Sequence, residues 1–307
     1  MSRHTPSGRR AGYQPSIAPR ANEQRLQKFI AASGVDSRRN CERYILSGRV
    51  MVNNETVTNP GHSVHPTTDI VLLDGDRLRL PKLKYYLVNK PKGVLCTNRD
   101  PFGRPRAIDL VPDDGSRLFT VGRLDENTQG LLLLTNDGEL AEYMAHPRYE
   151  VVRRYRAQVA GVPTQGTLAQ LRSGMRFTEG YFRFGEVRFL KRRGRSAFLE
   201  IELCEGKNRE VRRMLARCGH KVIHLQRVAF GPLRIGHLNP GQFRELRAAE
   251  VRELRDFLAK GPDKRPLRSN SRRNSRNSRK PDRHRPGKPK ASASRKSERN
   301  QSQANTD

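Results

Sequence analysis

Residues 121–138, VGRLDENTQGLLLLTNDG, join a short polar turn to a run of four leucines. A continuous apolar run of this length, Leu131–Leu134, favours a strand that is buried on both faces. Gly122 and Gly130 bound the polar turn, and Asp125 lies inside it. The pattern therefore predicts a carboxylate held at the edge of the hydrophobic core.

Asp125 also has a purely structural interpretation, because a loop Asp often caps the backbone of its own turn. The neighbouring Glu126 is the other candidate for an acidic role, and Arg123 can extend from the same edge. Residues 205–214, EGKNREVRRM, open a helix with basic residues beside its apolar positions. An arginine from this helix, placed against Asp125, would keep the carboxylate ionised and fix its orientation, as a nucleophile requires.

Strands and helices are mixed on both sides of this stretch. Strand-like runs occur at residues 85–88, 151–159, 187–190 and 199–203. Helical patterns follow Asp137 and occur at residues 164–172, 211–218 and 248–258. Because they show no regular βαβ alternation, we predict an α+β fold, with a mixed, mostly antiparallel sheet flanked by helices.

A smaller unit is predicted before this domain. The apolar spacing of residues 26–30 predicts a helix that ends at Gly34, and Asp36 or Ser37 can cap a second helix that ends at Gly48. Two alternating valines then lead into Asn53-Asn54, a pair that tolerates the positive φ of a hairpin turn. The unit is therefore two short helices and a hairpin.

Five basic side chains of this unit lie off its apolar positions and share its solvent side: Lys28, Arg38, Arg39, Arg43 and Arg49. A solvated basic face is the alternative to a binding surface.

Charge is the dominant feature of the composition. The 307 residues hold 61 Lys and Arg against 31 Asp and Glu, a formal net charge of +30. Such a surface attracts polyanions, of which nucleic acid is the first candidate. No apolar run approaches the roughly 20 residues of a membrane span, and no apolar signal segment opens the chain. We therefore expect a cytoplasmic protein.

Residues 261–307 carry 15 Lys and Arg but four Asp and Glu, and residues 1–20 carry four Arg and no acid. Neither segment has enough apolar residues to offset its ordering entropy. We expect two disordered basic tails, 1–20 and 261–307, around a small domain at 21–80 and a larger one at 81–260.

The sequence predicts no cofactor and no metal. Neither a G-x-G-x-x-G nor a G-x-x-x-x-G-K-[ST] loop is present, so a nucleotide cofactor lacks support. The pairs His62/His65 and His220/His224 each lack a third ligand nearby. The four cysteines form no Cys-x-x-Cys pair.

Two families are recognised in these residues. Residues 25–57, RLQKFIAASGVDSRRNCERYILSGRVMVNNETV, resemble the S4 RNA-binding domain, except that Asn53-Asn54 replaces the usual Asn-Gly of its hairpin. GRLDENTQGLLLLTNDG, the Arg154-Tyr155-Arg156 triplet, EGKNREVRRML and HKVIHLQRVAFGPLRIGHL resemble the RsuA/RluB family of ribosomal RNA pseudouridine synthases. The combined resemblance covers residues 23–258.

This resemblance implies a function and its residues. Asp125 would be the catalytic aspartate and Arg212 its ion-pair partner, Tyr155 would pack on the flipped base, and Arg123 would help to hold the uridine out of its stack. Lys207 and Asn208 belong to the same motif and would also bind substrate. In the S4-like unit Arg38, Arg39 and Arg49 would contact RNA phosphates.

The resemblance thus predicts an isomerase that converts uridine to pseudouridine in ribosomal RNA or its precursor particles. The KNREVRR motif and the basic tail resemble the branch of the family that modifies 23S rRNA of the large subunit. We expect a monomer without cofactor or membrane association. Asp125 could attack the ribose, form a glycal or add to the uracil ring.

A non-catalytic ribosome-assembly protein is the alternative. It would gain nothing from an acid in its cleft. A DNA-binding protein is a third possibility, without a recognition-helix or heptad pattern to support it.

Overall fold

The computed structural model describes residues 23–259. The predicted basic tails, 1–20 and 261–307, lie outside the described residues. Within residues 23–259 no helix is both long and apolar enough to cross a membrane.

The N-terminal unit contains the two predicted helices and the hairpin, with further short strands. Its four-stranded sheet has the order β3-β2-β5-β6, and β1 pairs with β4. The elements are β1 Gln24–Arg25, α1 Leu26–Ala32, α2 Arg38–Leu46, β2 Val50–Val52, β3 Glu55–Thr56, β4 Ser63–Val64, β5 Val71–Leu73 and β6 Asp76–Arg77.

Local chemistry explains the boundaries of this unit. Ser37 is the N-cap of α2, and its Oγ accepts a hydrogen bond from the Asn40 amide at 3.2 Å. Gly34 follows α1 with a φ of 95°, and the hairpin residues Asn53 and Asn54 have φ of 49° and 70°. Asparagine tolerates this left-handed region better than most residues. The predicted caps and turn are therefore confirmed.

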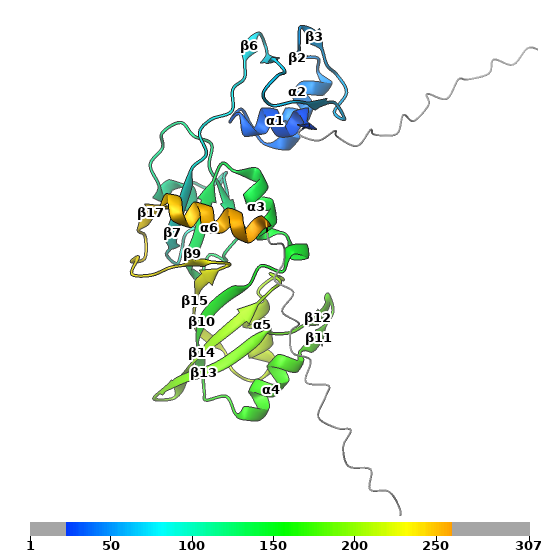
Figure 1. Ribbon diagram of the computed structural model, residues 1–307. Helices are drawn as coiled ribbons and strands as arrows, with labels where there is room; N and C mark the ends of the chain where they lie inside the picture. Colours follow the sequence, from blue (N-terminus) through cyan, green and yellow to red (C-terminus); the bar gives the residue numbers. More distant parts are fainter. Residues whose placement is uncertain (1–22, 260–307) are drawn as a thin grey trace, which may run out of the picture. The chain divides into compact units, whose positions relative to one another are not determined.

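The larger domain is built on a nine-stranded sheet. Its main path is β13-β14-β10-β15-β9-β7-β17 (Figure 1). In addition, β8 pairs with β9, and β16 pairs with β15. Neighbouring strands are antiparallel except for β15 and β9, which are parallel. The predicted α+β fold with a mostly antiparallel sheet is thereby confirmed.

The strands of this sheet are β7 Tyr85–Lys90, β8 Phe119–Val121, β9 Gln129–Thr135, β10 Arg153–Ala160, β13 Glu186–Arg193, β14 Ser196–Leu203, β15 Val222–Phe230, β16 Leu233–Arg234 and β17 Phe243–Glu245. A separate hairpin is formed by β11 Met175–Phe177 and β12 Gly180–Phe182. The helices are α3 Gly138–Ala145, α4 Gln165–Ser173, α5 Glu210–Arg217 and α6 Ala248–Ala259, with short 3₁₀ turns at Ala107–Leu110 and Pro147–Tyr149.

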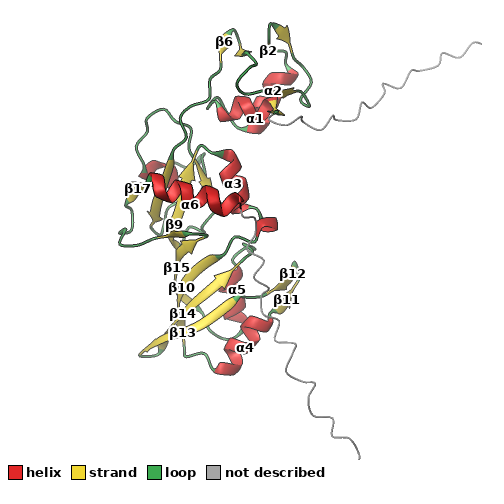
Figure 2. Cartoon of the chain, viewed as in Figure 1, coloured by secondary structure: helices red, strands yellow, loops and turns green. Residues whose placement is uncertain are grey.

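The four-leucine run lies in β9 and is fully buried, as predicted. Leu131 and Leu133 pack in one core with α3 and α6, whereas Leu132 packs in a second core with α4 and α5. Figure 2 shows these helices against the strands. Because successive side chains of a strand point to opposite faces, one apolar run serves both cores.

Gly130 fixes the start of β9 against β15. It pairs with Arg227 in the parallel ladder and has a φ of 121°. A Cβ at this position would lie 2.3 Å from the Arg227 carbonyl oxygen, so only glycine allows the two strands to approach. Gly130, which ends the polar turn, therefore also lets the start of β9 pair closely with β15 at the centre of the sheet.

Candidate active site

Asp125 lies in the loop between β8 and β9, and the backbone of this loop is held at several points. The Asp125 carbonyl accepts a hydrogen bond from the Thr128 amide at 2.9 Å, which closes the turn. Leu124 is buried, and its amide donates to Cys96 Sγ at 3.3 Å. The Asp125 side chain remains 38% exposed. A buried neighbour thus anchors the turn while the carboxylate reaches solvent.

Glu126, the rival acid, is placed differently. Its side chain is exposed, and its carbonyl accepts hydrogen bonds from the Gly93 amide at 3.0 Å and from Lys90 Nζ at 3.3 Å. The backbone of Glu126 therefore braces the Asp125 turn.

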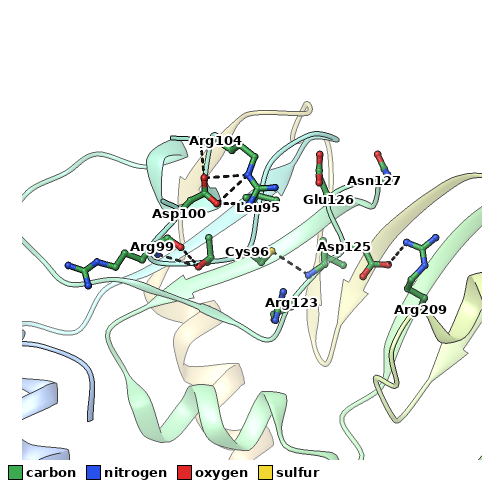
Figure 3. A pocket seen from close by; sticks show the side chains of 12 residues that line it. Leu95, Cys96, Arg99, Asp100, Arg104, Arg123, Asp125, Glu126, Asn127 and Arg209 are labelled. Atoms are coloured by element: carbon green, nitrogen blue, oxygen red, sulfur yellow. Dashed lines mark hydrogen bonds and ion pairs between the residues drawn. The ribbon is translucent and has the colours of Figure 1, made fainter. Parts of the chain in front are cut away.

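A cavity of about 520 Å³ opens on one side of Asp125 (Figure 3). Its walls are the turn around Asp125 and a loop at residues 95–104 that is braced by an ion pair of 2.7 Å between Asp100 and Arg104. Arg123 lines this cavity, as does Arg209, whose Nη1 lies 3.8 Å from Asp125 Oδ2. The side chains here are predominantly charged or polar, which suits a nucleotide backbone.

A second cavity, of about 440 Å³, also contains Asp125 and Arg123. Tyr155 of β10, 9% exposed, and Leu225 of β15 give it apolar surface, and Arg212 of α5 lines it beside them. An aromatic ring beside a carboxylate in a concave site fits a base that has left its stack.

The structure differs from the sequence-based prediction that Arg212 forms the ion pair with Asp125. The ion pair is made by Arg209. Arg212 Nη2 instead donates to the Asn127 carbonyl at 2.8 Å, and its Nη1 to the Val222 carbonyl at 3.4 Å. Burial lowers the pKa of Arg212, Arg209 adds to this effect, and the Asp125 carboxylate opposes it. Arg212 therefore holds the Asp125 turn through the Asn127 carbonyl.

Arg209 reaches Asp125 because of an unusual backbone conformation. It is the N-cap of α5, with a left-handed φ of 48°. This conformation is uncommon for a residue with a long side chain.

Lys207 and Asn208, which precede Arg209, both line the second cavity. The Lys207 ammonium pairs with Glu205 at 2.5 Å and donates to the Tyr181 carbonyl at 2.7 Å. It also lies 4.9 Å from the centre of the Phe182 ring. In the free protein Lys207 thus braces the wall of the cavity.

Glu210 is a buried acid in the same wall that sequence reasoning did not single out. It is 4% exposed, and its Oε2 accepts a hydrogen bond from the Lys207 amide at 3.2 Å. Burial raises the pKa of Glu210 to about 7, although the hydrogen bond and the Lys207 charge oppose this. In the folded protein the Glu210 carboxyl group, at the start of α5, therefore remains protonated at pH values below about 7.

Glu210→Gln is expected to flatten the pH dependence of stability. Below pH 4.5, the ordinary pKa of Glu, the folded and unfolded states both bind the proton, and as pH rises to about 7 only the folded state retains it. The stabilisation by Glu210 is thus present at low pH and lost as pH rises through 7, a change of about 3 kcal/mol. Urea unfolding of both proteins between pH 4.5 and 8 measures the difference. A constant difference across this range would contradict the prediction.

Three further cations lie buried near the site. Lys90 Nζ donates to the carbonyls of Pro91 at 2.8 Å and Val94 at 2.7 Å, in addition to Glu126. Arg153 donates to four carbonyls, and Arg227 Nε donates to the Leu131 carbonyl at 2.8 Å. Burial lowers the pKa of Lys90 and of Arg153. Their charges are spread over backbone carbonyls and keep the interior of the site positive.

The S4-like unit presents most of its predicted basic residues to solvent. Arg38, Arg39 and Arg43 are exposed, and Lys28 is half-buried. Arg49 differs, because its guanidinium makes two hydrogen bonds to Asp74 and lies 4.5 Å from the centre of the Tyr44 ring. Its charge is partly neutralised, so we expect Arg49 to attract phosphate less strongly than an unpaired arginine would.

The histidine pairs form no ligand set. His220 Nδ1 lies 2.9 Å from the Ala160 carbonyl, and His224 Nε2 lies 3.1 Å from Gln129 Oε1. Over residues 23–259 no cluster of three or more His, Cys, Asp or Glu side chains is arranged to hold a metal ion.

The fold and the site combine cavities lined by several arginines with a partly exposed carboxylate, an arrangement that suits an enzyme acting on RNA. Comparison with known proteins identifies its family. Residues 84–217 match the RNA pseudouridylate synthase family, and residues 24–70 match the S4 domain.

Two relatives span most of the chain. An uncharacterised RNA pseudouridine synthase of Aquifex aeolicus is 42% identical over 76% of this chain and 94% of its own length. Ribosomal large subunit pseudouridine synthase B of Bacillus subtilis is 38% identical over 78% of this chain and 98% of its own length. The crystal structure of a pseudouridylate synthase superposes with a TM-score of 0.54 at 26% identity, and covers 75% of this chain and 99% of that chain.

The chain belongs to the RNA pseudouridine synthase family, which confirms the resemblance found in the sequence. It is an isomerase that converts uridine to pseudouridine in RNA. Nothing in the fold, the site or the relatives favours a non-catalytic assembly protein.

Proposed function

We propose that this protein converts one uridine of 23S ribosomal RNA to pseudouridine, with Asp125 as the catalytic residue. The similarity to the large-subunit enzyme of Bacillus subtilis over nearly its whole length supports the choice of RNA. The observation that carries the catalytic assignment is the position of Asp125, which is partly exposed, lines both cavities, shares the second of them with Tyr155 and lies 3.8 Å from Arg209.

The chemistry needs few groups. The N1–C1′ bond of the nucleotide breaks, a C5–C1′ bond forms, and the proton lost from C5 is balanced by one gained at N1. All bonds change within one nucleotide, so the reaction consumes no co-substrate. Because every proposed residue comes from one chain, we propose a monomer without a cofactor, acting on ribosomes or their precursors in the cytoplasm.

Each residue has a place in this scheme. The target uridine must leave its stack, at a cost of a few kcal/mol. Tyr155 packs against the extruded base, and Arg123, which lines both cavities, occupies the space it leaves. Lys207 and Asn208 form the wall beside the base. Asp125 then acts at the ribose or the ring, with Arg212 holding its turn through the Asn127 carbonyl and Arg209 beside the carboxylate.

The RNA-binding surface of the S4-like unit completes the scheme. Arg38, Arg39 and Arg43 are exposed cations that can neutralise phosphates, with Lys28 and Arg49 as secondary contacts. These contacts add affinity and leave the choice of uridine to the catalytic domain.

The direct test is to map pseudouridines in ribosomal RNA from cells that lack this protein. One pseudouridine of 23S rRNA should disappear and return when the wild-type gene is restored. Restoration with an Asp125→Asn gene should not return it. Loss of a 16S rRNA site would overturn the choice of subunit, and an unchanged pseudouridine map would overturn the proposed substrate.

A further inference from the structure

A strongly basic hairpin end lies outside the site described above. Residues 187–199, VRFLKRRGRSAFL, join β13 to β14 and contain no Asp or Glu. Five basic side chains fall within eight residues of this segment: Arg188, Lys191, Arg192, Arg193 and Arg195. No part of the catalytic chemistry uses them.

The hairpin end is exposed on both of its faces. Every residue from 188 to 195 is exposed, although successive strand residues point to opposite faces. β13 is the last strand of the sheet and pairs only with β14 within the described residues. In Figure 1 the end of this hairpin projects beyond the helices that cover the sheet.

The charges of this hairpin have no carboxylate partner in the described part of the chain. Within residues 23–259 no ion pair joins any of the five to a carboxylate. Arg192 Nε donates to the Gly194 carbonyl, and Lys191 Nζ lies 5.5 Å from the centre of the Phe198 ring. By contrast, the nearby Arg154 and Arg172 both pair with glutamates. Five like charges left together repel one another unless a polyanion binds.

The register of the sheet relates this hairpin to the base pocket. Tyr155 is opposite Ile201, and Ala160, at the other end of β10, is opposite Ser196 at the start of β14. Five residues of strand separate the two positions, which corresponds to about 17 Å. RNA that flanks the target uridine is long enough to cover this distance, since RNA-binding domains span up to about 16 base pairs.

We propose that the 188–195 hairpin is a second RNA contact, which binds phosphates of the substrate RNA several nucleotides from the target uridine. The inference rests on the RNA substrate of the proposed function and adds a surface that the catalytic site does not contain. Lys and Arg on an edge strand also protect it from pairing with another sheet. Protection of the edge strand requires no contact with RNA, so an experiment can distinguish this alternative role from RNA binding.

The test compares the wild type with a triple variant, Lys191→Gln, Arg192→Gln and Arg193→Gln. On a long 23S rRNA fragment the variant should bind at least tenfold more weakly at 0.1 M salt. The slope of log K against log salt should fall by about 2, because each lost phosphate contact removes about 0.7 to 0.9 from it. On a stem-loop too short to reach the hairpin, kcat and KM should stay unchanged.

A matched control removes three exposed arginines elsewhere on the same domain: Arg234→Gln, Arg247→Gln and Arg252→Gln. It lowers the net charge equally and should keep most of the wild-type salt slope. Equal slopes for the hairpin variant and the wild type would overturn the proposal. The proposal would also be overturned if the hairpin variant self-associated in sedimentation but kept its RNA affinity. That result would mean that the basic residues protect the edge strand from pairing with another sheet.

Two further outcomes are distinguishable. If the variant binds naked RNA normally but loses affinity for ribosomal particles, the hairpin contacts a protein and the RNA proposal is overturned. If the wild type forms no pseudouridine in 23S rRNA, the proposed function fails, whereas the comparison of binding slopes still decides whether the hairpin contacts RNA.

Discussion

Asp125→Asn is expected to lower the rate of pseudouridine formation by at least about four orders of magnitude, as removal of an essential nucleophile does in other enzymes. The amide adds no bulk and deletes the charge that the reaction needs. Folding should be nearly unaffected, because the carboxylate is 38% exposed and its ion pair with Arg209, at 3.8 Å, is a surface contact. RNA affinity should rise slightly, because one negative charge near phosphate is lost.

Single-turnover assays on a 23S rRNA fragment, with binding measured in parallel, test this expectation. Glu126→Gln is the matched control, since it removes the neighbouring acid and leaves the backbone carbonyl that Lys90 and Gly93 bind. It should retain activity. Clear pseudouridine formation by Asp125→Asn, or its loss in Glu126→Gln, would transfer the catalytic assignment away from Asp125.

The sequence predicted the fold well wherever local patterns determine structure. The four leucines of β9 form a buried strand, and Ser37, Asp137 and Thr164 cap the helices that follow them. Such features depend on residues close in the chain, so their signals survive without tertiary information.

The central strand β15 was not predicted, because its polar residues depend on partners that are distant in the chain. His224, Gln226 and Arg227 interrupt its apolar residues, and Arg227 is buried nonetheless. Its guanidinium is stabilised by the Leu131 carbonyl and the face of the Phe230 ring, 4.9 Å away. Only the assembled sheet supplies the Leu131 carbonyl, which lies on β9, so the residue pattern of β15 alone looks too polar for a core strand.

The site was also predicted in part. The polar turn and the basic helix were correctly recognised as the elements that meet, as the two cavities show. The partner of Asp125 was not, because it depends on the left-handed backbone of Arg209, which no helical spacing predicts. The buried Glu210 was overlooked because it follows three polar or basic residues, Lys207, Asn208 and Arg209, and looks like a solvated helix start.

Arg212→Met is expected to lower kcat by about 100-fold or more, the cost typical of losing one preorganised contact of a reacting group. Its Nη2 holds the Asn127 carbonyl at 2.8 Å, two residues from Asp125, and its charge is close enough to interact with that carboxylate. Without it the turn loses a hydrogen bond and the carboxylate loses a nearby half-buried cation. KM should change little, because Arg212 acts on the position of Asp125.

Arg209→Met is the informative comparison. Arg209 is half exposed and contacts Asp125 at 3.8 Å, so its ion pair is screened by water and should contribute little. We expect its loss to lower kcat less than about tenfold while it weakens RNA binding and reduces the salt slope by up to about 0.9. Arg213→Met removes a cation that is paired with Glu179 and should leave kcat unchanged.

The three variants separate positioning from ion pairing, provided that urea unfolding shows each to be folded. A large fall in kcat for Arg209→Met with a normal kcat for Arg212→Met would mean that the ion pair of the free enzyme orients the carboxylate during the reaction. A rise in KM with an unchanged kcat for Arg212→Met would mean that this arginine binds RNA directly. With the expected order, the half-buried Arg212, which is bonded to the Asn127 carbonyl, sets the orientation of Asp125, and the exposed Arg209 is available to bind a phosphate of the incoming RNA.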